Sequence, residues 1–223
     1  MAQRQDRWND VKRSLEDFFF PRRCPFCGAG VGRELLCRGC EAALPYTGDK
    51  AVRRGGFGEC AAPLWYEGAV RQAVLDLKFH RRLGGVDCFG ALMARCAAEE
   101  FSGRFDAVTW VPVSEKRLRK RGFDQSQLLA ASLCVDWHVA PRQTLRKIAD
   151  NPAQSGIQES AARRANVLGV YEAVCPGEIA AHRWLLVDDV CTTGATLSEC
   201  VRVLKEAGAP EVVCLTLAHA RET

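Results

Sequence analysis

The sequence predicts an α/β fold, with a doubly wound, mainly parallel sheet and a small N-terminal metal-binding subdomain. After residue 61, short apolar runs typical of buried strands alternate with helical patterns, the order expected of a parallel sheet. Before it, two pairs of cysteines lie in a segment too short to form its own hydrophobic core. We therefore expect a helix over 1–21, a cysteine-rich subdomain with a linker over 22–60, and an α/β domain over 61–223.

The composition bounds the class of protein. Of 223 residues, 48% are hydrophobic and 26% charged, a globular balance that excludes disorder over most of the chain. A net charge of +4 favours anionic partners only weakly. We find no apolar run long enough to span a membrane and no signal peptide, so we expect a cytoplasmic protein. In that reducing compartment, twelve cysteines indicate metal ligands and buried thiols rather than disulfides.

The first segment is expected to be a short helix that packs against the rest of the protein. Its apolar residues recur on one helical face, and Pro21 ends the pattern. A helix lying on a membrane surface is the alternative, but Glu16 and Asp17 disfavour it.

The four cysteines of the next segment form a C-x2-C-x9-C-x2-C pattern, made of Cys24, Cys27, Cys37 and Cys40. Each pair can direct two thiolates at one ion, and two pairs complete a tetrahedron, so we predict a closed structural zinc site of the zinc-ribbon type. Gly28 follows the second ligand, where such turns need a permissive backbone. Disulfides or redox pairs are the alternative, which a reducing compartment disfavours. Residues 46–60 are expected to be a loop or linker.

Apolar patterns and capping residues predict alternating strands and helices in the α/β domain. We expect a short strand and then a helix within 64–79, a helix over 90–101 and a buried strand over 106–113. A helix over 124–137 opens with Asp124 as a plausible N-cap. A strand over 184–189, a helix over 195–208 closed by Gly208, and a strand over 211–220 complete the domain. Ligands of such sheets bind beyond the carboxyl ends of the strands.

An acid pair and a loop of small residues lie at the carboxyl end of the strand over 184–189. Asp188 and Asp189 are followed by the run CTTGAT, which ends at the start of a helix. A helix N-terminus presents N–H groups and the positive end of the dipole, so this loop suits a phosphate, although it lacks the G-K-[ST] of a Walker loop. Two carboxylates beside a phosphate site suit a sugar phosphate. The alternative is a pair of capping or metal-binding acids, as in receiver domains, which lack the TTGAT continuation.

The stretch LLVDDVCTTGAT resembles the motif by which type I phosphoribosyltransferases bind 5-phosphoribosyl 1-diphosphate (PRPP). The resemblance implies a sheet of the type I phosphoribosyltransferase kind, and contacts of Asp188 and Asp189 with the ribose hydroxyls. It also implies a loop that holds the 5′-phosphate, made of Cys191, Thr192, Thr193, Gly194, Ala195 and Thr196. We interpret Cys191 as a tolerated small residue rather than a nucleophile, because no neighbour in sequence would lower its pKa.

A basic run at 116–121 follows another buried strand. Such a run is ordinarily a solvated surface, but at a strand end it could clamp a diphosphate, and Arg119 and Arg121 are our candidates. The polar stretch 150–166, with Gln154 and Gln158, could close over a charged substrate or form a plain surface loop.

The chain as a whole resembles the ComF-type competence family. The stretches LKFHRR, RKRGFDQSQLLA, QSGIQESAARRANV and VDDVCTTGAT occur in that family's order, behind its cysteine knuckles. Extra knuckle cysteines occur in some relatives, whereas Cys60 stands alone here, and neither it nor His219 receives a role.

The resemblance implies Mg²⁺-dependent transfer of phosphoribosyl to an unknown acceptor, with release of diphosphate. The alternative is a binding module that senses PRPP or a nucleotide, or that handles single-stranded DNA or a protein of the competence machinery. A purely structural adaptor ranks last, because it would have no use for the loop. The sequence does not identify the acceptor.

Overall fold

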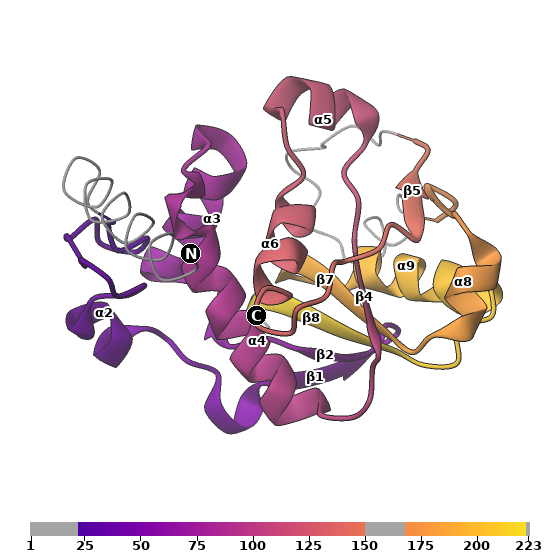
Figure 1. The fold of residues 1–223 in the computed structure, drawn as a ribbon, viewed down its shortest axis with the longest axis horizontal. Coiled ribbons are helices and arrows are strands. Elements are labelled where there is room, and N and C mark those ends of the chain that lie inside the picture. Colours follow the sequence, from indigo (N-terminus) through magenta and orange to yellow (C-terminus); the bar gives the residue numbers. More distant parts are fainter. Residues whose placement is uncertain (1–21, 150–167, 222–223) are drawn as a thin grey trace, which may run out of the picture.

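The computed structural model describes residues 22–149 and 168–221, and it confirms the α/β fold with a mainly parallel sheet (Figure 1). The helix expected over 1–21 and the whole polar stretch 150–166, with Gln154 and Gln158, lie outside the described residues. None of the described helices combines the length and the apolar character needed to cross a membrane.

The central sheet runs in the order β1-β2-β8-β7-β4. These strands are β1 (Val52–Gly55), β2 (Gly58–Ala61), β8 (Val212–His219), β7 (Trp184–Cys191) and β4 (Ala107–Trp110). All neighbours are parallel except the hairpin β1–β2. The two-residue strand β3 (Leu64–Trp65) continues the line of β2 along β8 in the same register. Pro63, which has no N–H to give to a ladder, lies in the gap between them.

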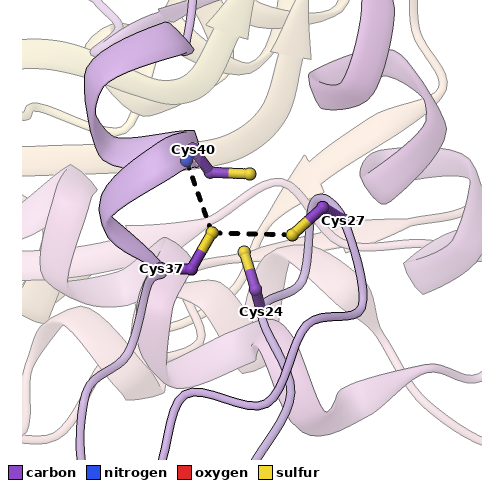
Figure 2. A group of neighbouring side chains, drawn as sticks. All are labelled: Cys24, Cys27, Cys37 and Cys40. Atoms are coloured by element: carbon purple, nitrogen blue, oxygen red, sulfur yellow. Dashed lines mark hydrogen bonds between the residues drawn. The ribbon is translucent and has the colours of Figure 1, made fainter.

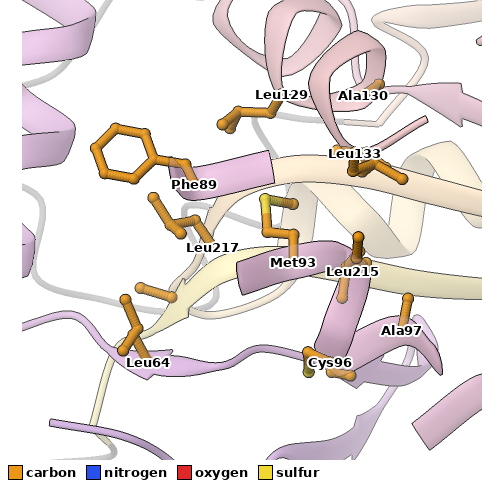
Figure 3. Packing of buried hydrophobic residues seen from close by; sticks show 14 of the residues in the cluster. Leu64, Phe89, Met93, Cys96, Ala97, Leu129, Ala130, Leu133, Leu215 and Leu217 are labelled. Atoms are coloured by element: carbon orange, nitrogen blue, oxygen red, sulfur yellow. The ribbon is translucent and has the colours of Figure 1, made fainter. Parts of the chain in front are cut away.

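Helices cover both faces of this sheet. One face packs against α3 (Gly68–His80), α4 (Val86–Phe101) and α6 (Gln125–Leu133), and Figure 3 shows Met93 of α4 beside Leu133 of α6 and Leu215 of β8. The other face packs against α8 (Pro176–Ala181), α9 (Ala195–Glu206) and a small antiparallel sheet of β5 (Leu145–Lys147) and β6 (Tyr171–Ala173). Residues 184–187 of β7 and 212–215 of β8 alternate between the two cores, as a pleated strand requires.

The predicted elements of the α/β domain are confirmed, with shifted ends. Asp124 does cap α6, because its carboxylate accepts the N–H groups of Ser126 and Gln127. Gly208 follows α9 with φ at +97°, a conformation that closes a helix readily only with glycine. Strand β7 runs through Val190 to Cys191, beyond the predicted end at residue 189.

The loop expected over residues 46–60 is wrong for most of its length. A short 3-10 turn at Gly48–Lys50 is followed by the hairpin of β1 and β2, so the central sheet begins at Val52. The glycines and arginines of this stretch hide the strand pattern, and its pairing with β8 is a long-range contact that no local pattern reports. Four other helical segments were also not predicted, namely α2 (Arg38–Ala43), α5 (Glu115–Arg121), α8 and the 3-10 turn Leu83–Gly85, and neither were the strands β5 and β6.

Candidate functional site

A cavity of about 270 Å³ opens beyond the carboxyl ends of β4 and β7. Both acids of the pair line it, together with Thr192 and Thr196 of the loop that follows. Its remaining lining comes from four other parts of the chain, at Tyr66, Lys78, Val111, Pro112, Val113, Arg117, Gln125, Lys147, Tyr171 and Val190. The position is the one where parallel sheets bind ligands.

The acid pair lies where the regular alternation of β7 breaks. Val187 and Val190 both pack against the core of α3, α4 and α6, although they are three positions apart along the strand. In a regular strand they would point to opposite faces. Asp188 and Asp189, which lie between these two valines, both line the cavity beyond the strand ends.

Each acid has its own partner. Lys78 of α3 makes an ion pair with Asp189, with Nζ 2.8 Å from Oδ1, while Oδ2 is buried without a hydrogen-bond partner among the described residues. Burial lowers the pKa of Lys78, but the neighbouring carboxylates outweigh it, so that the pKa lies above its usual value. The unsatisfied oxygen of Asp189 is therefore an acceptor available to a ligand.

Asp188 is held by α6. Ser126 donates its hydroxyl to Asp188 Oδ1 over 2.8 Å, and the N–H of Asp189 donates to the same oxygen over 2.9 Å. Burial, together with the charge of Asp189, raises the pKa of Asp188 to about 7, against the opposing effects of Lys78 and Ser126. A carboxyl group with such a pKa can gain or lose a proton near neutral pH.

The loop between β7 and α9 turns sharply at Gly194. This residue has φ at +73° and precedes the first turn of α9, which runs for 12 residues from Ala195. A Cβ at Gly194 would overlap the ring of Phe57. Thr192 and Thr193 are exposed, and Thr193 Oγ1 accepts the N–H of Ala195. The loop therefore exposes hydroxyl groups at a helix N-terminus, as an anion site requires.

The hairpin β1–β2 braces this loop from behind. Phe57, in the turn of the hairpin, is only 4% exposed and packs against the loop at Gly194. Arg53 of β1 donates to the carbonyl oxygens of Thr192 and Ala220, each over 3.3 Å. The segment expected to be a linker thus supports the loop that the sequence marks as the phosphate site.

Three cationic side chains line the cavity, namely Lys78, Arg117 and Lys147. Of the two arginines predicted to clamp a diphosphate, Arg119 is exposed and lies 3.2 Å from Glu115, outside the lining. Arg121 donates to Gln125 over 3.0 Å and stacks on Phe79, and it does not line the cavity either. Arg117, from the same helix α5, does.

The sequence did not predict Lys78 or Ser126, and within the basic run 116–121 the predicted clamp was Arg119 and Arg121 rather than Arg117. Ser126 and Arg117 follow the strand β4 closely, and the rule that ligands bind at strand ends could have found them. Lys78 lies at the end of α3, and only the packing of that helix over the sheet brings it to Asp189.

The four predicted zinc ligands do gather in one cluster, with all four sulfur atoms within 4.8 Å of one another (Figure 2). Cys27 and Cys37 are separated by 3.5 Å between sulfurs, close to the edge of a tetrahedron with Zn–S bonds of about 2.3 Å. Gly28 has φ at +77°, which confirms the permissive turn. Burial opposes ionisation of Cys24, but backbone N–H groups outweigh it and lower its pKa to about 6. The site fits a structural zinc ion.

Cys191 is not part of the loop surface. Its side chain is 1% exposed and belongs to a second buried cluster with Cys60 and His219. The pKa of Cys191 is lowered to about 5. A hydrogen bond with Cys60 lowers it most, burial raises it, and the proximity of His219 lowers it further. The prediction from the sequence concerned only neighbours in sequence, whereas Cys60 and His219 are distant in sequence and reach Cys191 through the fold.

Comparisons with known proteins match two separate parts of the chain to two domain families. Residues 119–223 match the phosphoribosyl transferase domain family, and residues 15–56 match the double zinc ribbon domain family. The second match contains four cysteines, enough for one four-thiolate zinc site.

Two curated relatives carry competence names. Competence protein F of Haemophilus influenzae is 32% identical over 118 residues, which cover 52% of this chain and 51% of that protein. Competence protein ComFC of Bacillus subtilis is 23% identical over 191 residues, which cover 83% of this chain and 72% of that protein. The chain thus spans about half the length of the first relative and most of the second. The zinc ribbon match in front of a phosphoribosyl transferase match, together with these two relatives, supports a ComF-type protein of the phosphoribosyltransferase superfamily.

Proposed function

We propose that the cavity binds PRPP and that the protein transfers its phosphoribosyl group to an acceptor, with release of diphosphate. The main support for this proposal is that the acid pair and the loop before α9 line the same cavity. The ribose hydroxyls would donate to Asp188 and to the unsatisfied Oδ2 of Asp189. The 5′-phosphate would lie against Thr192 to Thr196, at the positive end of α9.

The diphosphate would lie at the basic side of the cavity. Arg117 and Lys147 line that side, and Arg119 and Arg121 remain our candidates for an outer clamp on the same helix. Carboxylate oxygens suit Mg²⁺, which binds proteins through few carboxylates and keeps several waters, so Asp188 and Asp189 fit such an ion. When bound, Mg²⁺ would offset the charge of the diphosphate.

The reaction breaks the bond between ribose C1 and the diphosphate oxygen, and the bonding electrons leave with diphosphate. A nucleophilic nitrogen of the acceptor forms the new bond to C1 and then loses a proton. Catalysis would come from positioning and from the two carboxylates beside the positive charge that develops on the ribose. With a pKa of about 7, Asp188 could also accept the proton.

Calorimetric titration of PRPP with MgCl₂ tests the ligand. We expect binding by the wild type, at least a tenfold loss for Asp188→Asn and for Asp189→Asn, and no loss for Asp136→Asn. Asp136 is exposed and lies outside the cavity, so it controls for the removal of a charge. No binding by the wild type, or equal losses in all three variants, would refute the assignment.

A screen for diphosphate release from PRPP then separates an enzyme from a sensor. Bases and amines are offered in turn as acceptors, and the Asp188→Asn variant measures background hydrolysis. Release that depends on one acceptor identifies a transferase. Binding without release with any acceptor favours the sensing function.

A basic groove beside the cavity favours the second candidate function, binding of single-stranded DNA. The groove has a volume of about 350 Å³ and is lined by Lys116, Arg146 and Lys147 among other residues between α5 and β5. Phosphate contacts release counterions, so affinity for a labelled oligonucleotide should fall steeply with salt. We expect Lys116→Ala to reduce the salt slope by about one and the exposed Lys50→Ala to leave it unchanged. A negligible affinity at all salt concentrations would exclude this function.

A further inference from the structure

A second group of metal-binding side chains lies beneath the loop, apart from the zinc ribbon. It consists of Cys60 of β2, Cys191 at the end of β7 and His219 at the end of β8. Their sulfur and nitrogen ligand atoms all lie within 4.8 Å of one another, and none of the three residues is more than 1% exposed. Sheet register produces the group, because Cys191 and His219 are partners across β7 and β8.

The histidine of this group is oriented as a metal ligand would be. His219 Nε2 lies 2.9 Å from the carbonyl oxygen of Ala51 and 3.1 Å from that of Cys60. Because carbonyl oxygens only accept hydrogen bonds, Nε2 carries the proton. The neutral ring then has a lone pair on Nδ1, which is fully buried and has no hydrogen-bond partner among the described residues. Ligating histidines characteristically donate their other N–H to a carbonyl or carboxylate in this way.

We propose that Cys60, Cys191 and His219 form a second zinc site. Two thiolates and a neutral imidazole supply three of the four ligands that zinc takes, with zero net charge around Zn²⁺, which suits a buried site. A water molecule or another donor would occupy the fourth position. On binding, the two thiols lose two protons as two Zn–S bonds and one Zn–N bond form. Bonds of about 2.0–2.3 Å separate ligand atoms by roughly 3.5–4 Å, so the cluster needs little movement.

This zinc would act as a staple at the base of the loop. Cys60 belongs to the hairpin that braces the loop, and Cys191 is the residue immediately before Thr192. The ion would join the edge hairpin to β7 and β8 independently of any ligand in the cavity. The inference does not rest on the proposed function.

Native mass spectrometry of the full chain, purified without chelators and supplied with zinc, tests the proposal. We expect two zinc ions per chain in the wild type, and one in each of Cys60→Ala, Cys191→Ala and Cys37→Ser. Cys200→Ala should keep two, because Cys200 is an equally buried thiol outside both clusters. One zinc in the wild type, with Cys37→Ser retaining none, would overturn the proposal.

Two further measurements use the wild type alone and so do not depend on whether the variants fold. After cadmium exchange, the ¹¹³Cd spectrum of the wild type should contain two resonances, one of them shifted upfield because nitrogen replaces thiolates. A single resonance would contradict the second site. A metal-free wild-type mass lower by two hydrogen atoms, with a Cys60–Cys191 disulfide in the peptide map, would show a redox pair in place of the metal.

Discussion

The brace behind the loop makes Gly194→Ala a sharp test of the site's construction. Gly194 has φ at +73°, and a Cβ there would overlap the Phe57 ring, which is 4% exposed and cannot move into solvent freely. Left-handed backbone costs an L-residue about 1–2 kcal/mol. Overpacking a buried site adds about 1–3 kcal/mol. We therefore expect Gly194→Ala to lower the free energy of unfolding by about 2–5 kcal/mol.

Urea unfolding with a matched control separates the two contributions. Gly103 has φ at +72°, and a Cβ there would meet nothing within 4 Å, so Gly103→Ala measures backbone strain alone, about 1–2 kcal/mol. The difference between the two variants then measures the clash with Phe57. If Gly194→Ala costs no more than Gly103→Ala, the hairpin does not brace the loop.

A double-mutant cycle locates the clash. Phe57→Ala alone should cost about 3–5 kcal/mol through the cavity it leaves. In its presence Gly194→Ala should cost less, because the added methyl group enters that cavity, with a coupling energy of at least about 1 kcal/mol. Additive costs would contradict direct contact.

Three further predictions concern the cavity. The pKa of Asp188 is raised to about 7, so this carboxyl group binds more protons in the native state than in the unfolded state. Its contribution therefore lowers the stability of the protein as pH rises from about 4 to about 7. Urea unfolding at several pH values should show Asp188→Asn gaining stability relative to the wild type in that window. Asp124→Ala should destabilise the protein by about 1–2 kcal/mol in urea titrations, since it removes the cap of α6, whereas Asp124→Asn should recover part of this. In PRPP titrations, Arg117→Ala should weaken binding at least tenfold and Arg119→Ala less than twofold, because only Arg117 lines the cavity; equal losses would favour an outer clamp.

The sequence predicted a feature accurately where the residues that form it lie close together in the chain. The cysteine pairs are close in sequence and so reveal their ligand set, and the acid pair lies in one uninterrupted motif at a strand end. Asp124 could be predicted as a cap because capping acts within a few residues. These features need no knowledge of how distant elements pack.

The parts that could not be predicted all depend on pairing between distant strands or helices. Lys78 reaches Asp189 only because α3 packs over the end of β7, and Cys60 reaches Cys191 only because β2 pairs with β8. The hairpin of β1 and β2 could not be predicted for the same reason. Its glycines predict a loop, and one of them instead marks the turn of a strand pair whose phenylalanine occupies the space that Gly194 leaves open.

The break in β7 links these observations to the chemistry. A regular strand would send Asp188 and Asp189 to opposite faces, one toward α3 and the other toward α9. In this strand both acids line one cavity, Val187 and Val190 contact the same core, and Cys191 enters the buried cluster with Cys60 and His219. The end of β7 thus presents two carboxylates to the cavity and, two residues later, a thiol to the hairpin. The residues that face the cavity and the residue that contacts the supporting hairpin therefore lie in one short segment of β7.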